Sequence, residues 1–155
     1  RHDEFPNPLD ARYSYHVYTK LDIEAMRRAC EFIKGKHDFK SFCSVHTDVD
    51  TTVRTVYDVH IDVTPDKRLL QMSGLMKSAG ESSKGKQHPE IIDIYVTGNG
   101  FLYNMVRIIA GTLIEVGQGK IKPEEIPAII EACDREKAGP TAPAKGLTLI
   151  GYRMM

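Results

Sequence analysis

The stretch GNGFLYNMVRIIAGTLIEVG, residues 98–117, decides the expected fold. It follows a strand-like apolar run, IIDIYVT at 91–97, and opens with a glycine-rich tight turn. From about Phe101 to Val116 the apolar residues recur at helical spacing, and the predicted core stripe contains Leu102, Met105 or Val106, Ile109, Leu113 and Val116. This stretch therefore predicts a strand, a turn and a helix in succession.

One charged residue, Arg107, interrupts the apolar run between Phe101 and Ile114. The nearest acid on the same helix is Glu115, about 12 Å away along the axis at 1.5 Å per residue. If Arg107 is buried, its guanidinium needs a carboxylate or a phosphate from elsewhere, because an unpaired buried charge is strongly unfavourable. The alternative is that Arg107 reaches solvent or caps loop carbonyls, and the pattern alone leaves both possibilities open.

Strands and helices alternate irregularly around this stretch. The clearest strand is VRTVYDVHIDV at 53–63, whose odd-numbered residues share one face while Arg54, Asp58, His60 and Asp62 share the other. Further expected elements are an arm at 1–20, a helix at 23–34 with Asp22 as N-cap, a short turn or helix at 37–42, a loop at 64–90, a helix beginning at Pro123, a loop at 134–146 and a strand at 147–154. The pattern predicts one α+β domain over 1–155, with a largely antiparallel sheet and helices packed on one face.

Composition narrows the class of protein. Lys plus Arg and Asp plus Glu are both 21 in 155 residues, so the net charge is zero, which argues against a general polyanion binder. No apolar run reaches the roughly 18 residues of a membrane span, and the segment at 1–10 lacks the apolar core of a signal peptide. Three widely spaced cysteines suit reduced thiols better than a disulfide framework. We expect a cytoplasmic protein with no membrane association.

The sequence contains only incomplete versions of the common dinucleotide-binding, phosphate-binding and zinc-binding motifs. Gly98-Asn99-Gly100 starts like a dinucleotide-binding turn, but Tyr103 stands where the third glycine belongs. Gly119-Lys120 lacks the following Ser or Thr of a phosphate-binding loop. The residues His37, Cys43 and His46 match no standard zinc spacing, so we predict no metal site.

Several ordered motifs resemble one family, the TruA-type tRNA pseudouridine synthases. The segment at 98–120 closely resembles the late signature of that family. The matching segments before and after it are KHDFKSFCS at 36–44, TVRTVYDVHI at 52–61 and DREKAGPTAPAKGLTLIGYRM at 134–154. The resemblance covers nearly the whole chain and implies a pseudouridine synthase-like half-fold.

The resemblance implies an isomerase that converts uridine to pseudouridine in the anticodon stem-loop of tRNA. It implies RNA binding, a homodimer in the intact protein, and chemistry without an organic cofactor or a metal. The arginine that matches Arg107 orients the catalytic aspartate, and a nearby cation favours the ionised carboxylate. A flipped base needs an apolar or aromatic wall, for which Phe101, Tyr103 and Leu147 are the candidates, and Asn104 is a fourth expected substrate-binding residue.

The family's aspartate lies in an N-terminal motif, Arg-Thr-Asp-Ala-Gly-Val-His, which has no match in this sequence. The only Arg-Thr pair, Arg54-Thr55, is followed by Val56 where the motif has aspartate. We therefore expect the chain to be a C-terminal catalytic region, inactive alone, with Arg107 facing an open cleft. Two alternatives remain: a non-catalytic RNA-binding or assembly module of the same fold, and a small-molecule enzyme of α+β type. The roles of Cys30, Cys43 and Cys133 are not indicated.

Overall fold

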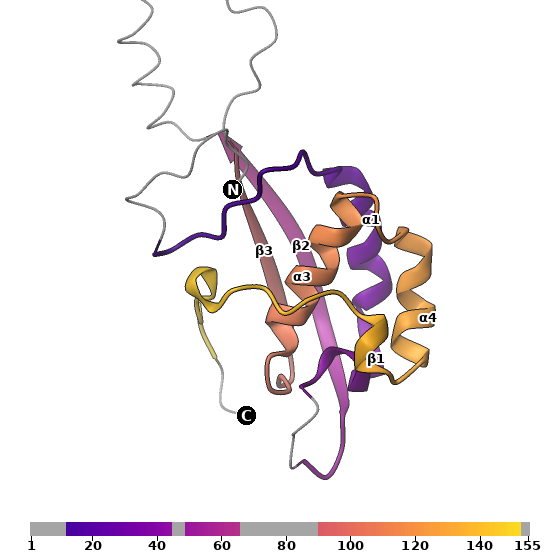
Figure 1. Cartoon of the computed structure of the whole chain (residues 1–155). Coiled ribbons are helices and arrows are strands. Elements are labelled where there is room, and N and C mark those ends of the chain that lie inside the picture. The colour runs from indigo at the N-terminus through magenta and orange to yellow at the C-terminus, as the bar shows by residue number, and fades with distance from the viewer. Residues whose placement is uncertain (1–11, 45–48, 66–89, 153–155) are drawn as a thin grey trace, which may run out of the picture.

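The computed structural model describes residues 12–44, 49–65 and 90–152. A three-stranded antiparallel sheet runs in the order β1 (Gly35–Asp38), β2 (Val53–Pro65) and β3 (Glu90–Gly98). The helices α1 (Ile23–Ile33), α3 (Met105–Gly117) and α4 (Ile126–Glu131) lie together on one side of that sheet (Figure 1). The predicted α+β class with an antiparallel sheet is confirmed.

Helix α1 begins as its sequence predicts. The Asp22 side chain accepts a hydrogen bond from the Ala25 backbone N–H at 2.9 Å, which satisfies one free amide of the first turn. The buried face of the helix consists of Ala25, Met26, Ala29, Cys30 and Ile33. Its C-cap is Lys34, and the chain turns into β1 through Gly35 at a φ of 112°.

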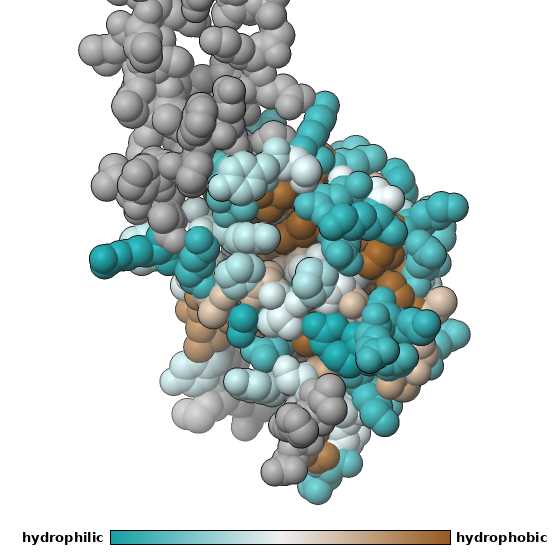
Figure 2. Space-filling view, viewed as in Figure 1, coloured by the Kyte–Doolittle hydropathy of each residue, from teal (hydrophilic) through white to brown (hydrophobic). Residues whose placement is uncertain are grey.

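The core lies between these helices and the sheet. Its largest fully buried side chains include Phe39, Phe42, Met26, Ile108, Ile109 and Leu113. The outer side of the helices is mainly hydrophilic, with apolar residues visible only between polar side chains (Figure 2). Ser41 is buried as well, and its hydroxyl donates to the Ile129 carbonyl at 2.6 Å. This bond ties the 3₁₀ turn Lys40–Phe42 to α4.

The predicted alternation of strand 53–63 is wrong at one point. Val56 pairs with Gly98 whereas Asp58 pairs with Thr97, so β2 carries a bulge at Tyr57. Val56 is buried although its number is even, and Tyr57 is exposed although its number is odd. The extra residue shifts the alternation by one, so the residues before the bulge face the opposite way from the expectation.

The helix after the GNG turn starts later than predicted. Residues 101–104 form a turn, and α3 begins at Met105 after Asn104, which has a φ of 63°. That left-handed conformation interrupts a helix, and asparagine is among the few residues that adopt it readily. The core stripe otherwise matches the prediction, with Ile108 added to it.

Other boundaries differ from the expectation too. The predicted strand at 147–154 is absent from its described part, since residues 147–152 have no strand pairing. Strand β1 was not predicted, and the helix expected at Pro123 begins with a 3₁₀ turn, Pro123–Glu125, before α4. The expected loop at 134–146 contains two further 3₁₀ turns, Arg135–Lys137 and Ala144–Gly146. Most of the arm predicted at 1–20 and most of the loop predicted at 64–90 lie outside the described residues.

Candidate functional site

Arg107 is half-buried in the first turn of α3, and two hydrogen bonds set its orientation. Its Nε donates to the Ala142 carbonyl at 2.7 Å, and its Nη1 donates to the Asn104 side-chain oxygen at 2.7 Å. Within residues 12–44, 49–65 and 90–152, Arg107 forms no ion pair with a carboxylate. The arginine does bond a loop carbonyl, as the structural alternative predicted, while three of its five N–H donors remain for another group.

The loop that contains Ala142 lies directly against α3. Figure 1 shows the chain beyond α4 returning across α3 toward the C-terminal end. A Cβ on Gly111 would lie 1.8 Å from the Pro140 carbonyl oxygen, and a Cβ on Gly139 would lie 2.6 Å from the Thr112 Cα. The Ala142 N–H donates back to the Arg107 carbonyl at 3.1 Å. The two glycines therefore allow the loop backbone to reach the helix and the arginine.

Asn104 uses both ends of its amide within the protein. Its oxygen accepts from Arg107, and its nitrogen donates to the Ser44 hydroxyl at 2.9 Å. The Ser44 N–H also donates to the Tyr103 carbonyl, at 3.3 Å. In this geometry Asn104 orients Arg107 and joins the turn to the segment after Phe42, and its predicted contact with substrate stays a prediction.

Three apolar or aromatic side chains of the predicted set are exposed. The exposed fractions are 41% for Phe101, 67% for Tyr103 and 53% for Leu147. Phe101 and Tyr103 lie in the turn before α3, close in sequence to Arg107, and the Phe101 ring packs near Gly98. Leu147 follows the 3₁₀ turn Ala144–Gly146, five residues beyond Ala142. These three side chains are therefore accessible to a ligand.

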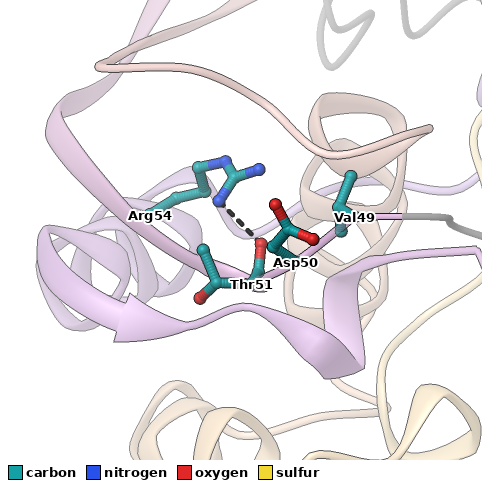
Figure 3. Close-up of a pocket in the computed structure, with 4 residues that line it drawn as sticks. All are labelled: Val49, Asp50, Thr51 and Arg54. Carbon is teal, nitrogen blue, oxygen red and sulfur yellow. Dashed lines mark hydrogen bonds between the residues drawn. The ribbon is translucent and has the colours of Figure 1, made fainter.

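A shallow, open pocket of about 360 Å³ lies at the start of β2 and is lined by Val49, Asp50, Thr51 and Arg54 (Figure 3). Arg54 Nη1 donates to the carbonyls of Thr51 and Val53, at 2.9 and 2.7 Å. Its Nε lies 3.9 Å from a Cβ built on Gly100, so the arginine is adjacent to the GNG turn. The sequence pattern predicts Arg54 on the same polar face of β2 as Asp58, His60 and Asp62. The bulge at Tyr57 moves Arg54 to the opposite face, and this bulge has no clear local signal in the sequence.

The remaining reactive groups occur apart from one another. No group of three His, Cys, Asp or Glu side chains in the described parts of the chain is arranged to hold a metal. His37 Nε2 lies 2.8 Å from the Lys34 carbonyl, Cys43 is buried, and His46 is outside the described residues. Burial raises the pKa of the Cys30 thiol to about 11, and it also raises the pKa of Cys133, with Asp38 contributing. These thiols are therefore poor nucleophiles at neutral pH.

Among the described residues, every helix is too short or too polar to cross a membrane.

The chain matches known proteins over most of its length. A family model described as tRNA pseudouridine synthase matches residues 29–153. The tRNA pseudouridine synthase A of Brevibacillus brevis is 48% identical over 140 residues, which are 89% of this chain and 47% of that protein. Its namesake from Bacillus subtilis is 42% identical over 147 residues, 95% of this chain and 50% of that protein.

A third relative, tRNA pseudouridine synthase A 2 of Clostridium perfringens, is 43% identical over 146 residues, 94% of this chain and 50% of that protein. The chain thus spans about half the length of the curated relatives it matches. The family model covers far more than half of the chain and includes the turn, Arg107 and the loop that holds it. The chain therefore belongs to the tRNA pseudouridine synthase family.

Proposed function

We propose that this chain forms the Arg107-bearing part of a tRNA pseudouridine synthase that isomerises uridine in the anticodon stem-loop of tRNA. The observation that carries the proposal is the state of Arg107: it is half-buried, it is oriented by Ala142 and Asn104, and it has no carboxylate partner in the described part of the chain. An arginine restrained in this way is suited to receive a carboxylate through its remaining N–H groups.

The proposed partner of Arg107 is the catalytic aspartate, supplied from outside these 155 residues. The isomerisation replaces the N1–C1′ bond of uridine by a C5–C1′ bond, and it needs no oxidant or reductant. The aspartate has to be ionised to act on the base or the sugar. Arg107 favours the ionised form and fixes the direction of the carboxylate, so it acts as a positioning cation.

The proposed wall for the flipped base consists of Phe101, Tyr103 and Leu147, all of which are exposed. A base removed from its stack loses stacking energy, which contact with aromatic and apolar side chains replaces in part. A full-length synthase would act on tRNA as a homodimer in the cytoplasm. The zero net charge of this chain then leaves much of the electrostatic attraction for tRNA to the rest of the protein.

The test uses a full-length protein that contains this chain, with Arg107→Lys as the variant. Lysine keeps the charge but loses the planar fork that bonds Ala142, Asn104 and a carboxylate together. We expect the single-turnover rate of pseudouridine formation to fall about 100-fold, the order of loss caused by a misplaced catalytic group. The dissociation constant for tRNA should change less than about threefold.

The matched control is Arg28→Lys, because Arg28 is exposed on α1. Equal losses of rate and affinity for Arg107→Lys would contradict the positioning role and would indicate a phosphate contact instead. If the wild-type full-length protein binds tRNA but forms no pseudouridine, the alternative of a non-catalytic RNA-binding module is supported.

A further inference from the structure

A second arginine, Arg135, holds the same loop that orients Arg107. Its Nη1 donates to the carbonyls of Ala138 and Gly139, at 3.3 and 3.0 Å, and its Nη2 donates to the Thr141 hydroxyl at 3.1 Å. Arg135 is half-buried and forms no ion pair within the described ranges of the chain. The hydrogen bonds of its guanidinium within the described residues therefore all go to the four residues that precede Ala142.

The backbone next to Arg135 is itself anchored in the core. The Asp134 N–H donates to the hydroxyl of Ser41 at 2.8 Å, and Ser41 is fully buried. The Asp134 side chain accepts from the Glu136 N–H at 3.0 Å, which starts the 3₁₀ turn Arg135–Lys137. Arg135 therefore extends from a fixed point toward the loop.

The opposite side of the loop is bound to α3. The Gly139 N–H donates to the buried Thr112 hydroxyl at 2.9 Å, and that hydroxyl donates to the Ile108 carbonyl at 2.8 Å. Three residues further on, Ala142 exchanges hydrogen bonds with Arg107 through the Ala142 N–H and carbonyl. The loop 138–142 is thus held between Arg135 and helix α3, and its far end sets the direction of the Arg107 side chain.

We propose that Arg135 is a positioning residue of the isomerisation, which acts through the loop 138–142 to orient Arg107. Its role in the reaction rests on the proposed function, whereas the mechanical coupling between the two arginines does not. Charge-assisted hydrogen bonds to three acceptors restrain the loop, and the Ala142 carbonyl passes this restraint to Arg107 Nε. Without Arg135, the loop is bound on one side only and the Arg107 guanidinium gains alternative orientations.

The first measurement concerns the coupling and needs no activity. Hydrogen exchange of the Arg107 Nε–H is followed by NMR in this chain labelled with ¹⁵N-arginine, and the resonance is identified by its loss in Arg107→Lys. We expect exchange to be at least about 10-fold faster in Arg135→Ala than in the wild type, because the bond to Ala142 is weakened. Lys137→Ala, an exposed change in the same 3₁₀ turn, should leave it unchanged.

A milder variant covers the case in which Arg135→Ala does not fold. Thr141→Val preserves the shape of the side chain but removes the acceptor of Arg135 Nη2. We expect exchange of the Arg107 Nε–H to rise about two- to fivefold in this variant. Wild-type exchange rates in folded Arg135→Ala, or in Thr141→Val when Arg135→Ala is unfolded, would overturn the proposal.

The second measurement is a double-mutant cycle on pseudouridine formation by the full-length protein. Arg135→Ala should lower the single-turnover rate about 10- to 100-fold with little change in tRNA affinity. The same change in an Arg107→Lys background should cost less than about threefold, because residues that act through one group are not additive. Full additivity would overturn the positioning role. Absence of product from the wild type would refute the proposed function, while the exchange measurement would still decide the coupling.

Discussion

At the residue scale, Cys30 shows how burial couples a side chain to stability. The thiol lies on the inner face of α1 with an exposed fraction of 1%, and desolvation is the main reason its pKa rises from 9.0 to about 11. Glu31 raises the pKa further, whereas Lys34 lowers it. The folded chain therefore keeps the thiol proton at a pH where the unfolded chain has lost it.

We expect this difference to destabilise the fold at alkaline pH. The contribution of Cys30 is fully present below pH 9.0 and is lost as the pH rises toward about 11. Between pH 8 and 10.5 the free energy of unfolding should fall about 2 kcal/mol more in the wild type than in Cys30→Ala. Urea denaturation at several pH values measures this. Cys133→Ala is the comparison: the pKa of its thiol is raised as well, but the side chain is only half-buried, so the difference from the wild type should be smaller. Parallel pH curves for wild type and Cys30→Ala would contradict the prediction.

The residues of the candidate site show what sequence could and could not predict. The isolation of Arg107 in an apolar run is a local feature, and it predicts that a buried guanidinium at this position needs a partner. Of the two acceptors that the structure provides, Asn104 is three residues away on the same turn, whereas Ala142 lies 35 residues further along the chain in a loop without regular periodicity. Such a contact follows from the tertiary packing of Gly111 and Gly139, which no local pattern indicates.

At the scale of elements, the contact between α3 and the loop 138–142 depends on the absence of a side chain. Alanine is usually better than glycine inside a helix by about 1 kcal/mol. At Gly111 we expect the opposite, a loss of about 1–3 kcal/mol, because its Cβ would overlap the Pro140 carbonyl and move the loop. Thermal or urea denaturation of Gly111→Ala measures the change. Gly151→Ala, where the added Cβ meets nothing within 4 Å, is the control. An increase in stability would show that the loop yields without cost.

The register of β2 and β3 places two acidic residues opposite each other. Asp62 lies directly opposite Asp93, and both side chains are exposed. Like charges at opposed positions are destabilising, so Asp93→Asn should raise the free energy of unfolding by about 0.3–0.5 kcal/mol at low salt. The gain should disappear near 1 M NaCl, where screening is strong. Glu90→Gln is the control, since Glu90 is opposite Pro65, and a gain independent of salt would exclude the electrostatic explanation.

Elements with strong local signals were predicted best. Helix α1 has both an N-cap and an apolar stripe, and the structure confirms them. Strand β1, Gly-Lys-His-Asp, has no apolar residue and pairs only because β2 lies beside it. The converse error concerns residues 147–152, whose apolar alternation predicts a strand. Without a neighbouring strand to pair with in the described sheet, they remain irregular and expose Leu149, Ile150 and Tyr152.

At the scale of the whole molecule, the proposed function depends on a carboxylate from outside the described residues. The chain has balanced charge, and the carboxylate proposed to pair with Arg107 is not among its described residues. We expect the purified chain to form no detectable pseudouridine in unmodified tRNA, whereas a full-length protein containing it should form the product. A tritium-release assay on C5-labelled uridine measures this, with heat-denatured protein as the blank. Product formed by the chain alone would contradict the proposal that the catalytic aspartate comes from outside this chain.

The bulge at Tyr57 has a consequence for how this strand tolerates insertions and deletions. The bulge shifts the alternation by one residue: upstream of it the buried residue is the even-numbered Val56, and downstream the buried residues are the odd-numbered Val59 and Ile61. Deleting a single residue here would restore a regular pleat but turn the whole upstream segment over. Arg54 would then leave its place beside Gly100 for the opposite face of the sheet. The face of the sheet on which Arg54 lies therefore depends on the number of residues between it and the bulge as well as on the residue itself.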